Sequence, residues 1–269
     1  MSIITKPQTE GAKVLVLDIE TAPMFGSFWG LWKQNINLKQ LYRDWYILCL
    51  SYKWLGEDKV TNHAIVDFNL YETEPENDAI LMGFVAELLD MADVVITHNG
   101  DKFDIKRMNT RLVKHGLLPP SPFKSIDTLK VAKAHFGFTS NKLDYIAQFL
   151  GVGKKLEHEG YELWDKCLKG DVDAWKRMKD YNDVDVEILE EVYYKLRPWI
   201  RNHPNLGLYN DEIEPSCPAC TSIRLIKRGV RTTNVNIFQR YQCADCGKYC
   251  QSPKALTTKE DRQNTMRNC

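Results

Sequence analysis

Short apolar runs alternate with amphipathic stretches along most of the chain. Residues 14–17 (VLVL) form a continuous apolar run, which predicts a strand buried on both faces. Residues 46–56 and 59–68 predict two further strands, and residues 93–100 predict a fourth. Three strands, a helix, a strand and then several helices indicate an α/β layer fold with a mixed sheet.

Helical periodicity accounts for much of the remaining chain. The predicted helices cover residues 76–93, 103–116, 127–137 and 141–151, a polar stretch around Trp164, and a long segment from about Asp173 to Trp199. Pro119, Pro120 and Pro122 predict a loop. Residues 22–45 are rich in aromatic side chains and have no clean period.

Length, composition and charge favour a large domain followed by a small one. The chain has 269 residues, of which 43% are apolar, enough for a sizeable core. We expect a domain over residues 13–203, a linker over 204–214 and a second domain over 215–269. The overall net charge is zero, but residues 217–269 carry +7 and residues 1–216 carry −7. A basic tail favours an anionic partner such as nucleic acid, with a solvated basic surface as the alternative.

Two acids follow the first apolar run. Side chains alternate along a strand, so Asp18 and Glu20 point to the same face, about 6–7 Å apart along the chain. Two carboxylates at the rim of a core repel each other and lose hydration. Asp104 stands between a predicted strand and a predicted helix, where it is either a further inward acid or a helix N-cap, with Asp101 as the alternative cap.

The long helix carries an acid within its apolar stripe. The stripe residues, spaced three and four apart, are Met178, Tyr181, Asp185, Ile188 and Val192. Burial of Asp185 is costly unless a positive charge pairs with it. In the structural alternative, a hydrogen bond or a Lys side chain compensates for the burial. Asp180 and Asp183 fall off the stripe and are expected to be solvated.

Four acids are therefore expected to face inward: Asp18, Glu20, Asp104 and Asp185. No matching inward run of Lys or Arg is visible in the sequence. Hard divalent cations such as Mg²⁺ or Mn²⁺ bind carboxylate oxygens and would cancel the repulsion. We therefore predict that these acids bind metal.

The order of these motifs resembles the DEDD superfamily of 3′–5′ exonucleases. The matching elements are Asp-x-Glu on a first strand, Asn-x4-Asp before a helix and Tyr-x3-Asp on a late helix. Tyr181 makes the chain similar to the DEDDy subclass. The segments HNGDKFD and SIDTLKVAKAHFGFTSNKLDYIAQFLG resemble the exonuclease domains of family B polymerases and phage-type exonucleases. The resemblance covers roughly residues 13–200 and implies an RNase H-like fold, a five-stranded mixed sheet flanked by helices.

The resemblance also implies a reaction, phosphodiester hydrolysis with two metal ions. The residues that match the family's ligands for Mg²⁺ or Mn²⁺ are Asp18, Glu20, Asp104 and Asp185. Tyr181 matches the residue that orients the attacking water. A phenol with a pKa of about 10 is a poor base at neutral pH, so we assign Tyr181 a positioning role.

Several other side chains have both a structural and a functional interpretation. Asp127 begins a predicted helix and is expected to cap it, with support of the metal ligands as the alternative. His98 and His158 either approach phosphate or are structural. Four aromatic residues either stack on a terminal base or pack in a core, namely Phe25, Phe28, Trp29 and Trp32.

Four of the eight cysteines form two Cys-x2-Cys pairs separated by 22 residues. These residues, Cys217, Cys220, Cys243 and Cys246, predict one structural Zn²⁺, with Cys250 as an alternative fourth ligand. The segment resembles a zinc ribbon of transposases and transcription factors. The basic residues between the pairs suit phosphate contacts and are Arg224, Lys227, Arg228, Arg231 and Arg240, with a protein contact as the alternative. Cys49 and Cys167 are expected to be inert core thiols.

We therefore expect a metal-dependent 3′–5′ exonuclease that acts on single-stranded DNA and uses its zinc ribbon to hold nucleic acid. An RNA-trimming exonuclease is the nearest alternative. A further alternative is a non-catalytic module that binds nucleic acid or protein. The presence of all four predicted metal-binding acids disfavours this alternative. No signal peptide or membrane-spanning apolar run is visible. We expect a cytoplasmic protein, in the bacterial host if phage-encoded, with a replication or recombination protein as a further partner and no membrane contact.

Overall fold

The computed structural model describes residues 11–157, 159–211 and 214–266, which form two compact units. The first unit covers Lys13–Val192 and the second begins at Tyr193. The division falls inside the long helix, ahead of the segment expected as a linker. Leu206, within that segment, is buried, and its N–H donates to the carbonyl of Pro218 at 2.8 Å. This part of the expected linker therefore packs within the second unit.

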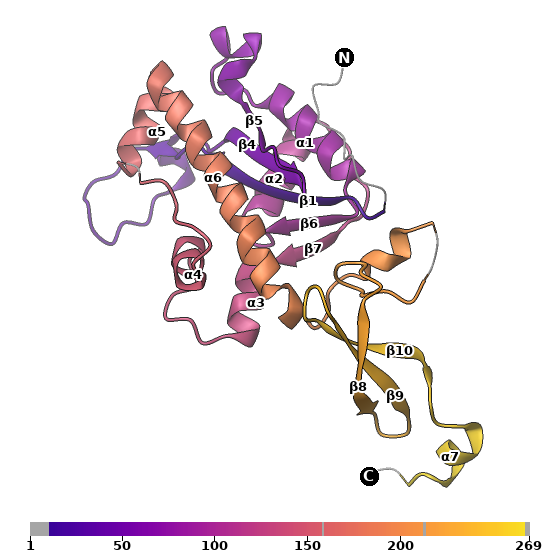
Figure 1. Cartoon of the computed structure of the whole chain (residues 1–269). Coiled ribbons are helices and arrows are strands. Elements are labelled where there is room, and N and C mark those ends of the chain that lie inside the picture. The colour runs from indigo at the N-terminus through magenta and orange to yellow at the C-terminus, as the bar shows by residue number, and fades with distance from the viewer. Residues whose placement is uncertain (1–10, 158, 212–213, 267–269) are drawn as a thin grey trace. The chain divides into compact units, whose positions relative to one another are not determined.

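A five-stranded sheet in the order β5-β4-β1-β6-β7 forms the centre of the first unit (Figure 1). Its strands are β1 (Val14–Thr21), β4 (Ile47–Trp54), β5 (Thr61–Ala64), β6 (Val94–Thr97) and β7 (Lys124–Asp127). β1 pairs antiparallel with β4 and parallel with β6, while β4–β5 is antiparallel and β6–β7 is parallel. The predicted mixed five-stranded sheet is confirmed.

The α-helices up to residue 196 overlap the segments predicted to be helical, and most of them are shorter than predicted. They are α1 (Ala79–Met91), α2 (Asp104–Lys114), α3 (Thr128–His135), α4 (Leu143–Leu150), α5 (Tyr161–Leu168) and α6 (Val172–Leu196). Short 3-10 turns cover Leu38–Gln40, Ile65–Asp67, Asn69–Glu72, Arg197–Trp199 and Leu206–Tyr209. The long helix ends at Leu196 because Pro198 disfavours helical geometry at the residue before it. No helix in the described part of the chain is both long and apolar enough to cross a bilayer.

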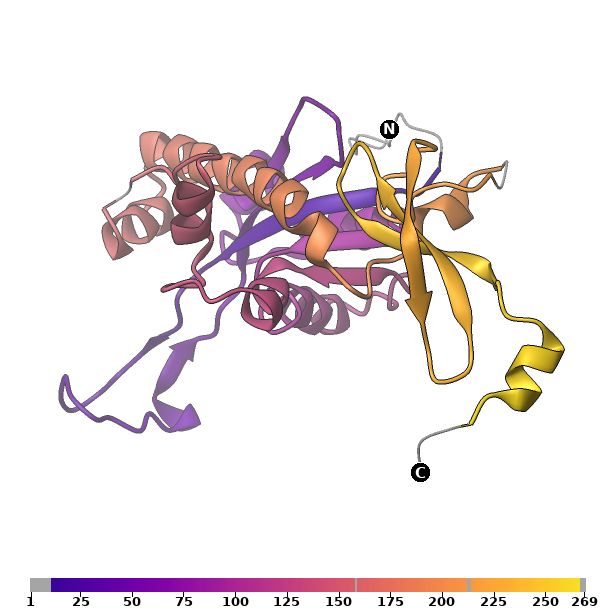
Figure 2. The same cartoon turned by 60° about the horizontal axis from the view of Figure 1, so that its bottom comes forward.

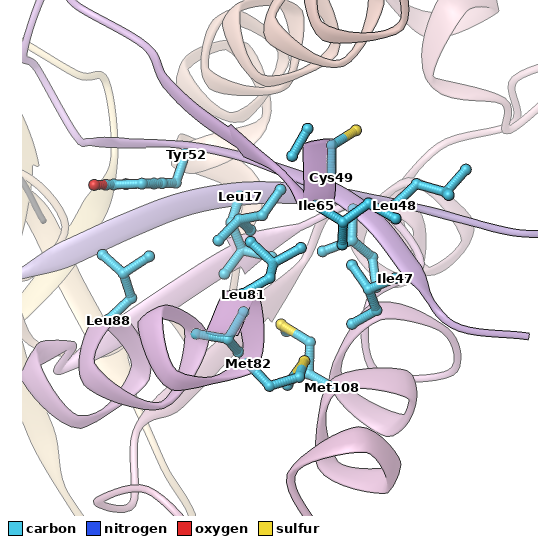
Figure 3. Packing of buried hydrophobic residues seen from close by; sticks show 14 of the residues in the cluster. Leu17, Ile47, Leu48, Cys49, Tyr52, Ile65, Leu81, Met82, Leu88 and Met108 are labelled. Atoms are coloured by element: carbon cyan, nitrogen blue, oxygen red, sulfur yellow. The ribbon is translucent and has the colours of Figure 1, made fainter. Parts of the chain in front are cut away.

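The two faces of β1 have different partners. Leu15, Leu17 and Ile19 belong to a buried cluster with residues of α1 and α2. Figure 3 shows Leu17 near Leu81 and Met82 of that cluster. Each fully buried aliphatic side chain of this kind contributes about 1.5–3 kcal/mol to stability. The side chain of Asp18 points to the opposite face, which α6 covers.

Two parts of the first unit were not predicted from the sequence pattern. β7 follows the proline loop and has no apolar run, since Lys124 and Ser125 are exposed and only Ile126 and Asp127 are buried. The aromatic-rich segment contains a small two-stranded hairpin, formed by β2 (Phe25–Gly26) and β3 (Leu41–Arg43).

The second unit contains an antiparallel three-stranded sheet in the order β10-β9-β8. Its elements are β8 (Leu225–Thr232), β9 (Ile237–Cys243), β10 (Tyr249–Ala255) and a terminal helix, α7 (Lys259–Asn264). The small core around Cys217, Ala219 and Cys243 also includes Leu225. Because this core contains few large apolar side chains, hydrophobic burial alone gives the sheet little stability.

Candidate active site

Strand β1 places Asp18 and Glu20 on the face that lies under α6. The pairing of β1 with β4 is regular through Glu20 and shifts only between Glu20 and Thr21, so the alternation that aligns the two acids is preserved. Asn182 of α6 is fully buried and donates from Nδ2 to Asp18 Oδ2 at 2.7 Å. The thiol of Cys49 donates to Asn182 Oδ1 at 3.6 Å. This bridge fixes one carboxylate oxygen of Asp18, and the sequence pattern did not single out Asn182.

A tight turn aims Asp104 at the same strand. Asn99 adopts a left-handed conformation with φ of 72°. A Cβ at Gly100 would lie 2.1 Å from Thr97 Oγ1, so the close approach of this turn to β6 requires glycine. Asp104 is the first residue of α2 and is 2% exposed, and its Oδ1 accepts a hydrogen bond from the Ile19 N–H at 3.3 Å. The N-cap alternative is therefore wrong for Asp104.

The neighbouring Asp101 does not cap this helix either. Phe103 occupies the N-cap position of α2, without a side-chain cap. Asp101 instead accepts hydrogen bonds from Ser125 Oγ and Lys130 Nζ, each at 2.5 Å. The described contacts of Asp101 therefore join the turn to β7 and α3.

The predicted inward stripe of α6 is buried at all of its positions. It consists of Met178, Tyr181, Asp185, Ile188 and Val192. Asp180 is exposed, as expected. Asp183 is not fully solvated, since it is half-buried and accepts hydrogen bonds from Ser51 Oγ at 2.6 Å and Asn62 Nδ2 at 3.1 Å. Burial raises the pKa of Asp183, and the expectation of a solvated side chain is wrong because β4 and β5 present polar partners to it.

Three of the acids meet closely. Carboxylate oxygens of Asp18, Glu20 and Asp185 lie within 4.8 Å of one another. Asp104 is outside this closest group, but it contacts the backbone between Asp18 and Glu20 through Ile19. The structure thus brings all four acids to one region, with three in direct proximity.

Burial and mutual repulsion oppose ionisation of these acids. Desolvation, followed by the charges of Asp104, Glu20 and Asp185, raises the pKa of Asp18 well above its usual range. Burial and the charge of Asp185 raise the pKa of Glu20 to about 8. Burial also raises the pKa of Asp104 to about 7, against the opposing effect of its backbone hydrogen bonds. The cluster therefore gains from a nearby positive charge.

Lys155 provides one such charge and agrees with the alternative that a Lys compensates for buried Asp185, although the sequence showed no matching inward run of Lys or Arg. It lies between α4 and α5, where its N–H donates to Asp144 Oδ1 at 3.0 Å. Its Nζ donates to Asp185 Oδ2 at 2.5 Å and to the Tyr181 hydroxyl at 3.2 Å. Burial opposes the charge of Lys155, but the charges of Asp185, Tyr181 and Asp18 outweigh it and raise the pKa of this ammonium group. Lys155 lies in a polar segment without periodicity, so the pattern gave no indication of its direction.

Tyr181 is held from two sides. Its hydroxyl accepts the hydrogen bond from Lys155, and its ring packs edge-on against Trp164 with centroids 6.3 Å apart. Burial, and then the charge of Asp185, raise the pKa of Tyr181 above its ordinary value. The phenol therefore keeps its proton at neutral pH.

The remaining polar candidates near the acids have structural partners. Asp127 caps α3, as predicted, because its Oδ1 accepts from the N–H groups of Leu129 and Lys130. Both ring nitrogens of His98 are engaged, with Thr128 Oγ1 and the Asn141 carbonyl each at 2.9 Å. These contacts favour the structural interpretation of His98. His158 lies outside the described residues.

The four aromatic candidates differ in their surroundings. Phe25 is half-buried, with the Arg43 guanidinium 3.8 Å from its ring centroid. Phe28, Trp29 and Trp32 are 55%, 97% and 84% exposed. Core packing is therefore wrong for these three residues.

In the second unit the four paired cysteines come together. The Sγ atoms of Cys217, Cys220, Cys243 and Cys246 all lie within 4.8 Å of one another. Cys250, on β10, is not part of this group. Cys49 and Cys167 are fully buried in the first unit, as expected for core thiols, and burial raises the pKa of each.

The basic candidates of the second unit lie on or next to β8 and β9. Arg224, Lys227, Arg228, Arg231 and Arg240 are all exposed. Some of them are held by neighbours, since Arg224 pairs with Asp245 at 2.6 Å and Arg240 Nε donates to the carbonyl of Arg228 at 2.8 Å. The two strands thus present a group of cations to solvent.

The chain's matches to known proteins include the following three. A family model described as the RNase_H superfamily matches residues 41–197. The DNA polymerase III PolC-type of Ureaplasma parvum serovar 3 is 27% identical over 204 residues, which make up 74% of this chain and 14% of that polymerase. The family B DNA polymerase from the hyperthermophilic archaeon Pyrobaculum calidifontis matches in fold, with a TM-score of 0.51 and 15% identity over 76% of this chain and 26% of that one. The chain therefore spans only a minor part of either polymerase.

Proposed function

Because this chain belongs to the RNase H superfamily, we propose that it is a metal-dependent nuclease that hydrolyses phosphodiester bonds as a 3′–5′ exonuclease. The observation that carries the proposal is the meeting of the carboxylate oxygens of Asp18, Glu20 and Asp185 within 4.8 Å. Such a concentration of acids, with Asp185 buried and the other two half-buried, is unfavourable by itself and becomes favourable when cations bind.

The donor set fits Mg²⁺ or Mn²⁺. Only carboxylate oxygens contribute to this group among the described residues, and hard divalent cations prefer such ligands. Asp18, Glu20 and Asp185 would hold the two cations, with Asp104 beside them. When bound, the cations lower the pKa of the attacking water and stabilise the charge that develops on the phosphodiester oxygens.

The surrounding side chains orient the reactants. Asn182 holds Asp18 by one oxygen, which prevents that carboxylate from turning away. Lys155 donates to the oxygen of Tyr181, so the proton of that hydroxyl is available for donation to another acceptor. Since the phenol keeps its proton at neutral pH, Tyr181 positions the attacking water and does not act as its base.

The finer assignments follow from the motifs. Tyr181, four residues before Asp185, supports the DEDDy type and, with it, the 3′–5′ direction. Single-stranded DNA is the favoured substrate and RNA the alternative. The chain's likeness to parts of two DNA polymerases supports DNA.

The second unit is proposed to be a zinc ribbon that holds nucleic acid. A tetrahedral site with Zn–S bonds of about 2.3 Å separates sulfur atoms by about 3.8 Å. The Sγ atoms of Cys217 and Cys246 are 3.5 Å apart, and those of Cys220 and Cys243 are 3.6 Å apart. These distances support one Zn²⁺, which would supply folding energy that the small core lacks. The exposed cations of β8 and β9 would contact phosphates and release counterions.

A gel assay with end-labelled single strands tests the proposal. DNA and RNA of the same sequence, labelled at the 5′ end, are incubated with Mg²⁺, Mn²⁺ or EDTA. We expect a ladder that shortens stepwise, disappears in EDTA, and slows at least about 100-fold in the Asp18→Asn variant. Asp180→Asn, an exposed acid of the same helix as Asp185, is the matched control and should cleave at the wild-type rate. Cleavage that persists in EDTA or in Asp18→Asn would refute the metal mechanism.

A further inference from the structure

An arm leaves the sheet directly after the acid pair. We define it as residues 22–46, which Figure 2 shows as an indigo to violet loop that extends away from the helices. The N–H of Ala22 donates to the carbonyl of Tyr46 at 2.8 Å and closes the base of the arm. Because Glu20 lies only two residues before Ala22, the base of the arm adjoins the acid cluster.

The arm has a defined hairpin structure. β2 pairs with β3, and the N–H of Ser27 donates to the carbonyl of Gln40 at 2.9 Å. Asn37 caps the turn Leu38–Gln40 by accepting from the Lys39 N–H at 3.0 Å, and Gln40 Oε1 accepts from the Asn37 N–H at 2.9 Å. Local hydrogen bonds therefore shape an arm that has no buried core of its own.

The outer part of the arm exposes large apolar side chains. Trp29 and Trp32 are almost entirely in solvent. Other exposed apolar residues of the arm are Met24, Phe28, Leu31, Ile36, Leu38 and Tyr42. An exposed patch of this kind marks an interaction site, because such surface is unfavourable in water.

The charge of the arm identifies the kind of partner. The arm contains Lys33, Lys39 and Arg43 against one acid, Asp44, a net charge of +2, whereas residues 1–216 carry a net charge of −7. Arg43 pairs with Glu76 at 2.8 Å, so the two lysines are the cations considered for contact with a partner. Aromatic rings interleaved with cations suit a single-stranded nucleic acid, whose bases stack on the rings and whose phosphates attract the cations. Contact between the arms of two copies of this chain would bring like charges together, which disfavours self-association.

A hollow lies at the base of the arm, and one of its lining residues, Trp164, packs against Tyr181. Its lining includes Pro23, Met24 and Trp45 of the arm, together with Arg107 and Trp164. The Arg107 guanidinium lies 4.2 Å from the Trp45 ring centroid. Aromatic and cationic groups are thus present at the tip of the arm and again beside the catalytic candidates.

We propose that the arm is a binding site for the single strand that leads to the acid cluster. Bases stack on Trp29 and Trp32, and Lys33 and Lys39 contact the phosphates between them. This inference rests on the proposed nuclease function, and it assigns to the first unit a nucleic-acid site separate from the basic strands of the second unit.

Binding of a fluorescein-labelled oligothymidine, followed by polarisation with the full chain in buffer without added Mg²⁺, Mn²⁺ or chelator, tests the arm. The double variant Trp29→Ala/Trp32→Ala should raise Kd at least about 30-fold, the effect of losing two stacking contacts of about 1 kcal/mol each. Trp29→Phe/Trp32→Phe should retain most of the affinity, and Trp29→Leu/Trp32→Leu should lose it, because leucine is apolar but cannot stack. Lys33→Gln/Lys39→Gln should lower the slope of log K against log salt by about one.

Two controls distinguish stacking on the arm from a general loss of apolar surface or of folding. Leu118→Ala/Val172→Ala removes two other exposed apolar side chains and should leave Kd unchanged. Melting temperatures show that each variant is folded. Equal Kd for the wild type and the Trp→Ala double variant would overturn the proposal. The proposal would also be overturned if the Trp→Ala double variant had a lower molar mass than the wild type by light scattering but the same Kd. The arm would then be an interface between copies of the chain.

A separate measurement tests the proposed function without the arm. The wild type with Mn²⁺ is given the p-nitrophenyl ester of thymidine 5′-monophosphate, a phosphodiester too short to span from the acid cluster to the arm tip. Absence of hydrolysis, together with a raised Kd in the Trp→Ala variant, would refute the nuclease function and leave the arm as a binding site. Hydrolysis together with an unchanged Kd would refute the arm and leave the nuclease.

Discussion

Replacement of Lys155 by Met should destabilise the metal-free protein far more than the protein with Mn²⁺. Met keeps most of the length and apolar surface of the Lys side chain but carries no charge. In the metal-free state Lys155 is the cation in contact with Asp185 and Tyr181. Its loss would leave Asp185 buried beside Asp18 and Glu20 without this compensation.

The size of the effect follows from the geometry of the pair. Lys155 Nζ and Asp185 Oδ2 are 2.5 Å apart, and the two side chains are 26% and 2% exposed. Removing one partner of a fully buried pair costs about 3–5 kcal/mol. Partial exposure of Lys155 screens the interaction, so we expect a loss of about 2–3 kcal/mol in the free energy of unfolding. Mn²⁺ supplies positive charge to the same carboxylates and should restore most of that loss.

Urea unfolding followed by tryptophan fluorescence measures this, without added metal or chelator and in excess Mn²⁺. Lys154→Met is the matched control, because the neighbouring Lys154 forms an exposed pair with Glu157. It should leave the unfolding free energy nearly unchanged in either condition, because an exposed pair contributes little to stability. Equal destabilisation of Lys155→Met with and without Mn²⁺ would refute the idea that Lys155 and the metals compensate the same charges. If the Lys155→Met variant were as stable as the wild type without added metal, the Lys155–Asp185 pair would make no net contribution to stability.

Further predictions concern single side chains in both units. Tyr181→Phe should slow turnover while the binding of Mn²⁺ and of an oligonucleotide persists. If titrations showed that the variant binds neither Mn²⁺ nor the oligonucleotide, a positioning role would be contradicted. Metal analysis should find one Zn²⁺ per chain, and Cys243→Ser/Cys246→Ser should remove it; full zinc content in that variant would refute the site. Burial lowers the pKa of His203 from 6.5 to about 4. In the neutral ring Nδ1–H donates to the Pro204 carbonyl at 2.6 Å, and Nε2 accepts from the Tyr193 hydroxyl at 2.8 Å. Because the unfolded chain binds the proton more readily in this range, stability of the second unit should fall by up to about 3 kcal/mol as the pH drops from about 6.5 to about 4. His203→Gln should flatten that dependence in a pH series of melting curves, and an unchanged slope would contradict it.

The parts of the site that follow from periodicity could be predicted from the sequence. Alternation on β1 places Asp18 and Glu20 on one face, and the helical period places Tyr181 and Asp185 in one stripe, whatever the rest of the chain does. Asp104 needed more than periodicity. The same residue type at a helix start serves as a cap or points inward, and here the approach of Gly100 to Thr97 turns it toward β1.

Residues placed by tertiary structure could not be predicted in this way. The four residues of β7 contain no apolar run, and their strand geometry comes from pairing with β6. Lys155 lies outside any helix or strand, so its direction depends on the fold around it. Asn182 is adjacent to a stripe residue, and its role emerges only because Asp18 and Cys49 lie opposite it. Such contacts depend on which elements pack together, which local patterns do not specify.

The charge of the assembled site gives a reason for two metal ions instead of one. With its acids ionised, the cluster of Asp18, Glu20, Asp104 and Asp185 carries four negative charges, and Lys155 offsets one of them. One divalent cation would leave the site negative and repulsive toward a phosphodiester. Two would leave a single positive charge, equal in size to the negative charge of one phosphodiester group. Lys155 is therefore part of the electrostatic match, since without it the same two cations would only neutralise the acids and would leave no net attraction for the substrate.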